Sequence, residues 1–181
     1  MVNKRGSGIF RLSPVLQTSL PDKKIDCRLF FKISAGFGLR QRSVPMALEN
    51  IIYEKKGTVA YVRFNRPKNF NALDGGLIKD FTKAMEMCSD DDSVRAVVIT
   101  GEGKAFCSGG DIAVFRSFFD KDRAEPFREL IKALNPGIIT LRRMKKPVIA
   151  AVNGAVGGAG MSIVAACDFR ICAASVRFRA G

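Results

Sequence analysis

Two glycine-rich segments contain the residues whose types and spacing could do chemistry. The segment from Gly157 to Gly160 follows an apolar β-branched run, Val148–Val152, and precedes an apolar stretch of helical length. A buried strand, a glycine turn and a helix start leave unpaired backbone N–H groups at a positively polarised end. Small residues there let a ligand oxygen approach the main chain closely. This composition predicts a site that holds an oxyanion.

The earlier segment, Cys107–Asp111, is a second turn of the same kind. It follows a predicted buried strand over residues 94–100, and Asp111 is positioned to start the next helix. Ser108 is not in a G-x-S-x-G motif, and the chain contains no histidine that could activate it. We therefore expect this segment to act through its backbone and not through a nucleophile.

Three other interpretations compete for the later segment. Residues 147–167 are uncharged and include a small-xxx-small pair, as in a membrane span, but a proline, an asparagine and several glycines argue against one. The glycine spacing does not fit the G-x-G-x-x-G motif of a dinucleotide site. A purely structural use of these glycines, packing a helix on a sheet, is on this stretch alone at least as well supported as a functional one. We expect no membrane span.

The composition removes several classes of chemistry. The chain has 181 residues, no histidine and five widely spaced cysteines without a C-x-x-C pair. Metal sites built on histidine and Ser-His or Cys-His nucleophile pairs are thereby excluded within this chain. The acidic triplet Asp90–Asp92 lacks the glycine and closing glutamate of a calcium loop, so we expect no metal site. The cysteines are typical of reduced thiols in an intracellular protein, which favours the cytoplasm.

The positive charge does not by itself indicate nucleic-acid binding. Of the net charge of +13, residues 1–45 contribute nine bases and two acids, or +7, and the rest of the chain +6. No basic run of five or more occurs, and a moderately basic domain suits an anionic small ligand equally well. We expect no nucleic-acid partner. Residues 1–45 are predicted to be a poorly ordered leader, either an organelle transit segment, an extension before a start at Met46, or a mobile arm. A transit segment would place the protein in the mitochondrial matrix.

The remaining elements predict an α/β domain over residues 46–181. Runs at residues 51–54 and 58–64 predict a hairpin, and Asp74 is expected to cap a helix with one apolar stripe. A long helix over residues 124–144, bent near Pro136, precedes the later glycine turn, and two short strands follow it at residues 169–173 and 176–178. Alternating strands and helices could place both glycine turns at one end of the sheet, where ligands bind in such folds.

These motifs together resemble those of the enoyl-CoA hydratase/isomerase (crotonase) family. The resemblance covers Leu48 to Gly181 in order and spacing, through Asn65-Arg66-Pro67 with Asn71-Ala72-Leu73, then Lys104 to Ile112, then Pro147 to Gly160 with Cys167-Asp168. It implies a spiral of repeated ββα units, usually in trimers or pairs of trimers. It also implies an acyl-CoA thioester as the partner, with coenzyme A belonging to the substrate and no separate cofactor.

The resemblance also implies which residues form the site. The backbone N–H groups of Gly110 and Ala159 would hold the thioester oxygen as charge builds on it. Asp111, Ile112 and Ala113 would line the path of coenzyme A. Candidate partners for its phosphates are Lys68, Arg66 and Lys104, and Ala72, Ser108 and Gly158 complete the expected contacts.

The sequence departs from the family pattern at its acid–base groups. Ser162 occupies the position of the first glutamate used by hydratases of this family, and the second would fall immediately after Gly181. Serine with a single later glutamate would suit double-bond isomerisation. We expect residues 1–181 to be the N-terminal part of such an enzyme, inactive alone and prone to associate through apolar surface at Leu130–Leu141 and Ile163–Ala166. The alternative is a non-catalytic CoA-binding or interaction protein.

Overall fold

The computed structural model describes residues 48–119 and 125–179. The predicted leader over residues 1–45 lies outside the described residues, and so does Met46. The described part contains the alternating strands and helices that the sequence predicts, which confirms the α/β class.

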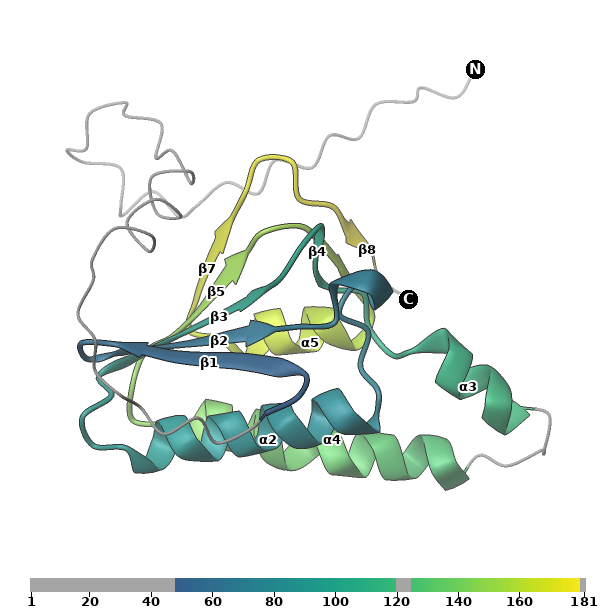
Figure 1. Cartoon of the computed structure of the whole chain (residues 1–181), viewed down its shortest axis with the longest axis horizontal. Helices are drawn as coiled ribbons and strands as arrows, with labels where there is room; N and C mark the ends of the chain where they lie inside the picture. Colours follow the sequence, from purple (N-terminus) through teal and green to yellow (C-terminus); the bar gives the residue numbers. More distant parts are fainter. Residues whose placement is uncertain (1–47, 120–124, 180–181) are drawn as a thin grey trace, which may run out of the picture. The chain divides into compact units, whose positions relative to one another are not determined.

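The larger sheet has five strands in the order β1-β2-β3-β5-β7 (Figure 1). The predicted hairpin is confirmed, because β1 and β2 pair antiparallel around a turn in which Gly57 has φ +58°. The pairs β2–β3, β3–β5 and β5–β7 are parallel. The strands are β1 Ile51–Lys56, β2 Val59–Phe64, β3 Ala96–Gly101, β5 Val148–Val152 and β7 Phe169–Cys172.

A smaller sheet of three parallel strands, in the order β4-β6-β8, was not predicted. Its strands are β4 Ala105–Cys107, β6 Ala155–Gly157 and β8 Phe178–Arg179. Two of them, β4 and β6, end at the first residue of a predicted glycine turn. Strands this short show no alternation of apolar and polar residues, so periodicity cannot reveal them.

Helices cover one face of the larger sheet. The long helices α2 and α4 lie side by side below the sheet in Figure 1, and α5 packs against α4 and against β4 and β6 of the smaller sheet. Asp74 caps α2 as predicted, accepting a hydrogen bond of 2.8 Å from the backbone N–H of Leu77. The predicted stripe of α2 is fully buried: Leu77, Phe81, Ala84, Met85 and Cys88. The helices are η2 Pro67–Asn69, α2 Gly75–Asp90, α3 Ile112–Phe119, α4 Glu125–Arg143 and α5 Ala159–Ala166. Pro136 lies inside α4, and the bend expected there stays a prediction.

The exposed apolar surface differs from the prediction. Ile131 and Ile139 on α4 are exposed as expected, but Ile163 and Val164 on α5 are buried. They are buried because α5 packs tightly on β4: a Cβ at Gly160 would lie 2.4 Å from the carbonyl oxygen of Cys107. The other exposed large apolar side chains include Phe169 and Ile171 on β7 and Phe178 on β8, which are edge strands of the larger and the smaller sheet.

Candidate functional site

Pairing of β4 with β6 brings the two glycine segments together. The strands are parallel, with Ala105 opposite Ala155 and Cys107 opposite Val156. Parallel strands end on the same side, so the residues that follow β4 and those that follow β6 leave the sheet as neighbours. The prediction that both turns lie at one end of a sheet is confirmed, although the sheet is the small one.

The two turns are in direct backbone contact. Gly109 has φ +100°, and a Cβ there would lie 3.0 Å from the carbonyl oxygen of Gly157 and 3.3 Å from the Cα of Gly158. Gly158 has φ +43°, and a Cβ on it would lie 3.6 Å from the Cα of Gly109. Gly109 is therefore required for its backbone conformation and also for its lack of a side chain. Gly110 and Ala159 each follow one of these touching glycines.

A short bridge to Leu73 sets the direction of the first turn. The Leu73 N–H donates to the Gly109 carbonyl at 2.7 Å, and the Asp111 N–H donates to the Leu73 carbonyl at 3.0 Å. Leu73 therefore pairs with the residues on both sides of Gly110. In such a parallel bridge, the groups of the intervening residue point away from the partner. Within residues 48–119 and 125–179, the Gly110 N–H makes no hydrogen bond to the protein.

The second turn presents an N–H group for a different reason. Ala159 is the first residue of α5, and the N–H groups of a first helical turn have no partner within their helix. The N-cap residue, Gly158, has no side chain that could accept from them. Nothing in the described part of the chain accepts a hydrogen bond from the Ala159 N–H. The site thus combines two uncommitted backbone donors on adjacent turns.

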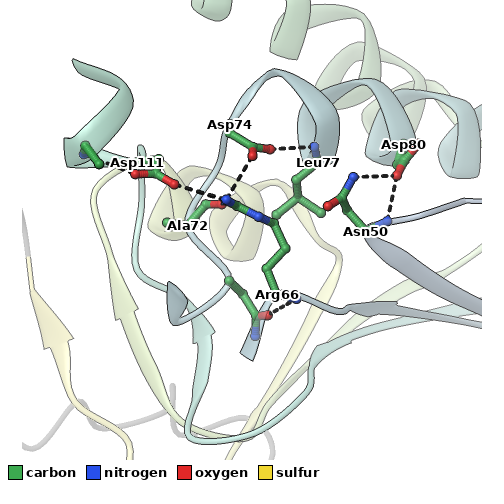
Figure 2. A network of polar contacts seen from close by, with 9 residues as sticks. Asn50, Arg66, Ala72, Asp74, Leu77, Asp80 and Asp111 are labelled. Carbon is green, nitrogen blue, oxygen red and sulfur yellow. Dashed lines mark hydrogen bonds and ion pairs between the residues drawn. The ribbon is translucent and has the colours of Figure 1, made fainter. Parts of the chain in front are cut away.

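Arg66 joins the first turn to the start of α2 (Figure 2). Its Nη1 and Nη2 atoms both lie 3.2 Å from Oδ2 of Asp111, and Nη2 lies 2.9 Å from Oδ2 of Asp74. Nη1 also donates to the carbonyl of Ala72. Phosphate binding by Arg66 stays a prediction, and the two carboxylates on its guanidinium group argue against it.

The carboxylate of Asp111 is held by groups of the protein, and its expected place beside coenzyme A stays a prediction. Its side chain is buried, and burial alone would raise its pKa. Hydrogen bonds from Arg66 and from the backbone N–H groups of Ala113 and Val114 outweigh burial and lower the pKa of Asp111 below its usual value. These N–H groups belong to the start of α3, so Asp111 starts that helix as predicted.

Two asparagines that the sequence analysis did not assign to the site fix the loop before β4. Asn71 is fully buried, has φ +55°, and donates from Nδ2 to the carbonyls of Ala105 at 2.8 Å and Glu102 at 3.0 Å. Asn153 accepts from the Gly101 N–H at 3.1 Å and donates to the Ala105 carbonyl at 3.4 Å. Neither residue has a periodicity signal. A buried polar side chain with positive φ is visible only in the folded chain.

The other predicted residues occupy varied positions around the two turns. Ser108, Ile112, Ala113, Gly158 and Ser162 are exposed, Gly110 and Ala159 are partly buried, and Ala72 is buried. Lys68 is exposed in η2, and the next turn of chain is tied to the first glycine segment because the Ser108 N–H donates to the Phe70 carbonyl at 3.1 Å. Ser162 lies about one helical turn after Ala159 on α5.

Cys107 is close to the site but unsuited to nucleophilic chemistry. It is fully buried, and burial raises the pKa of its thiol to about 11, against the opposing effect of a hydrogen bond from the Gly109 backbone. A thiol that stays protonated at neutral pH is a poor nucleophile.

The described residues contain neither a candidate metal centre nor a candidate membrane-spanning helix. Across residues 48–119 and 125–179, no cluster of three or more His, Cys, Asp or Glu side chains is placed to hold a metal ion. None of the helices described there is both long and apolar enough to cross a bilayer.

The fold places the chain among proteins with the crotonase fold, and comparison with known proteins agrees. The family model "Enoyl-CoA hydratase/isomerase" matches residues 54–181. The chain therefore belongs to the enoyl-CoA hydratase/isomerase family.

Individual relatives have similar sequences and structures. The chain is 39% identical over 135 residues to a crotonyl-CoA hydratase of Syntrophomonas wolfei, covering 74% of this chain and 50% of that protein. It is 34% identical over 132 residues to a probable peroxisomal enoyl-CoA hydratase of Arabidopsis thaliana, covering 72% of this chain and 47% of the relative. The crystal structure of an enoyl-CoA hydratase/carnithine racemase from Magnetospirillum magneticum superposes with a TM-score of 0.69 at 32% identity, covering 74% of this chain and 50% of that one. The chain spans about half the length of these relatives.

Proposed function

We propose that this chain binds an acyl-CoA thioester and polarises its carbonyl oxygen between the N–H groups of Gly110 and Ala159. The observation that carries the proposal is the backbone contact of Gly109 with Gly158, which makes these two uncommitted donors neighbours. Two donors aimed at one oxygen stabilise the negative charge that reaches it when the thioester becomes an enolate. In the whole enzyme, this activation would serve hydration or double-bond isomerisation of an enoyl-CoA.

Two exposed lysines support binding of an anionic coenzyme A. A Cβ at Gly103 would lie 3.0 Å from the Cβ of Pro67, so the turn before β4 touches the start of η2. Lys104 and Lys68 each follow one of these contacting residues, and both are exposed. Two neighbouring ammonium groups would attract the phosphates of coenzyme A at long range, more strongly at low salt.

Ser162 limits the chemistry that this part of the chain would perform. A hydroxyl is a poor base at neutral pH without an activating partner. The nearest carboxylate to the first turn, Asp111, is committed to Arg66. We therefore infer that the described residues bind and polarise the thioester, and that residues 1–181 do not supply the carboxylate that proton transfer needs. The second candidate function, a CoA-binding protein without catalysis, rests on the same serine.

Oligomeric state and location also belong to the proposal. The resemblance supports trimers or pairs of trimers for the whole enzyme. The cytoplasm remains our preferred location, while the peroxisomal and mitochondrial names of some relatives leave the matrix alternative in place.

Binding calorimetry with three ligands tests the proposal. Crotonyl-CoA offers the thioester oxygen, S-but-2-enyl-CoA replaces the carbonyl by a methylene group, and coenzyme A lacks the acyl chain. We expect crotonyl-CoA to bind about tenfold or more tightly than the thioether, the gain typical of hydrogen bonds to one polar oxygen. Equal affinity for both would refute the two-donor site. Turnover of crotonyl-CoA by residues 1–181 would instead contradict only the inference that these residues lack the carboxylate for proton transfer.

A further inference from the structure

Arg66 occupies an unusual position for a basic residue beside a site for an anionic ligand. It lies two residues after the end of β2, and its side chain is mostly buried, with 17% of its surface exposed. Its guanidinium contacts the N-cap residue of α2, Asp74, and the first residue before α3, Asp111. The three side chains carry one positive and two negative charges, so the cluster does not attract a phosphate.

The backbone of Arg66 is fixed as firmly as its side chain. Its N–H donates to Oδ1 of Asn71 at 2.9 Å, and its carbonyl accepts from the N–H groups of Asn69 and Asn71, both at 3.0 Å. A guanidinium on a fixed backbone, with both Nη atoms on one carboxylate oxygen, defines the position of that carboxylate. Figure 2 shows this arrangement, with Arg66 between the two aspartates.

Asp111 transmits that constraint to the donor residue. Its Oδ2 accepts from Arg66, its Oδ1 accepts from the Ala113 N–H at 3.1 Å, and its own N–H donates to Leu73. These three contacts hold the peptide that follows Gly110, whereas the preceding Gly109–Gly110 peptide, which carries the Gly110 N–H, is held by the hydrogen bond from the Leu73 N–H to the Gly109 carbonyl. Gly110 has no Cβ that restricts its dihedral angles, so the direction of its N–H depends on how the peptides on both sides of it are held.

We infer that Arg66 is a positioning residue for the proposed reaction, acting through Asp111 to aim the Gly110 N–H at the thioester oxygen. The inference rests on the proposed function, because it needs a carbonyl oxygen at that donor. Donors that are already aimed cost no reorganisation when charge develops, which is why their geometry governs rate and not only affinity. Arg66 would not touch the substrate.

The test compares variants by their preference for crotonyl-CoA over S-but-2-enyl-CoA. Arg66→Gln removes the positive charge and the two-nitrogen contact with Asp111, and Arg66→Lys keeps only the charge. Asp111→Asn keeps the shape of the side chain that accepts these bonds but removes its negative charge. Asp80→Asn is the matched control. Like Asp111, Asp80 is a hydrogen-bonded carboxylate, but it lies on α2 and accepts from Asn50, away from both turns. A purely structural role would lower stability without changing the ratio of the two affinities.

We expect Arg66→Gln to reduce the thioester preference by about tenfold, the loss of roughly one well-aligned hydrogen bond, with unchanged affinity for the thioether. Arg66→Lys should show a smaller loss and Asp80→Asn none. If Arg66→Gln does not fold, Arg66→Lys and Asp111→Asn decide the question, and a full thioester preference in both overturns the inference. A wild-type chain without any preference would refute the proposed function together with the inference, whereas a wild-type preference that the variants retain refutes the inference alone.

Discussion

Replacing Gly109 by alanine tests the contact on which the site depends. At φ +100° an L side chain is strained, which costs on the order of 1–3 kcal/mol. The new Cβ would also lie 3.0 Å from the Gly157 carbonyl oxygen and 3.3 Å from the Gly158 Cα. Both contacts are with backbone, which cannot rotate away like a flexible side chain, so the turns must separate. Overpacking of this kind adds about 1–3 kcal/mol.

The chain offers two matched controls for this substitution. Gly57 has φ +58° with nothing within 4 Å of its Cβ position, so Gly57→Ala measures the backbone strain alone, about 1 kcal/mol. Gly158→Ala combines positive φ with an ordinary contact of 3.6 Å and should fall between the two. We therefore expect Gly109→Ala to destabilise the chain by about 2 kcal/mol more than Gly57→Ala.

Urea unfolding followed by circular dichroism measures these differences directly. Calorimetry on the same samples should show that Gly109→Ala loses the preference for crotonyl-CoA over its thioether, whereas Gly57→Ala keeps it. A Gly109→Ala chain as stable as Gly57→Ala, with the preference intact, would refute the argument that the two turns touch at this glycine.

Three further predictions concern packing, buried amides and buried thiols. Gly160→Ala should destabilise the chain although alanine favours helices, because its Cβ would lie 2.4 Å from a β4 carbonyl oxygen. Gly75→Ala on α2, where the nearest contact of the new Cβ is at 4.0 Å, should instead stabilise the chain by up to about 1 kcal/mol. Thermal unfolding of both variants measures these opposite effects, and a stabilising Gly160→Ala would contradict the packing of α5 on β4. Asn71→Ala should lower the free energy of unfolding, measured with urea, by about 3 kcal/mol, because it leaves buried backbone carbonyls without their hydrogen-bond donor. Asn69→Ala, at an exposed position, should lower it by less than about 0.5 kcal/mol. Equal effects would contradict the role of Asn71 in fixing the loop before β4. Burial raises the pKa of the Cys88, Cys107 and Cys167 thiols from 9.0 to about 11 or 12, so unfolding lets them ionise and stability should fall above pH 9. From pH 8 to pH 10 the three thiols together should lower the free energy of unfolding by about 4 kcal/mol. Unfolding free energies that do not change over this pH range would argue against burial of these side chains.

Local patterns in the sequence were sufficient for the elements that local physics determines. The hairpin follows from two alternating runs around Gly57, and the start of α2 follows from Asp74, whose carboxylate accepts from the Leu77 N–H. The apolar stripe of α2 is buried as its spacing predicts. The two glycine turns were also located correctly, since glycine clusters after apolar runs are themselves the signal.

Features that depend on contacts distant in sequence could not be predicted in this way. Arg66 and Asp111 are 45 positions apart, and nothing in either local sequence distinguishes an ion pair from a phosphate ligand. The small sheet was missed because β4 and β6 have three residues each and gain their stability from pairing with one another. Burial of Ile163 depended on Gly160 fitting against β4, which is a property of two backbones at close range.

Infrared difference spectroscopy can detect directly whether the Gly110 and Ala159 N–H groups bind one thioester oxygen. Crotonyl-CoA labelled with carbon-13 at the thioester carbonyl would be compared free and bound to the 181-residue chain. Hydrogen bonds to the carbonyl oxygen weaken its double bond, so we predict a bound carbonyl band at clearly lower wavenumber, returning toward the free position in Gly109→Ala. A bound band at the free position in the wild-type chain would contradict the claim.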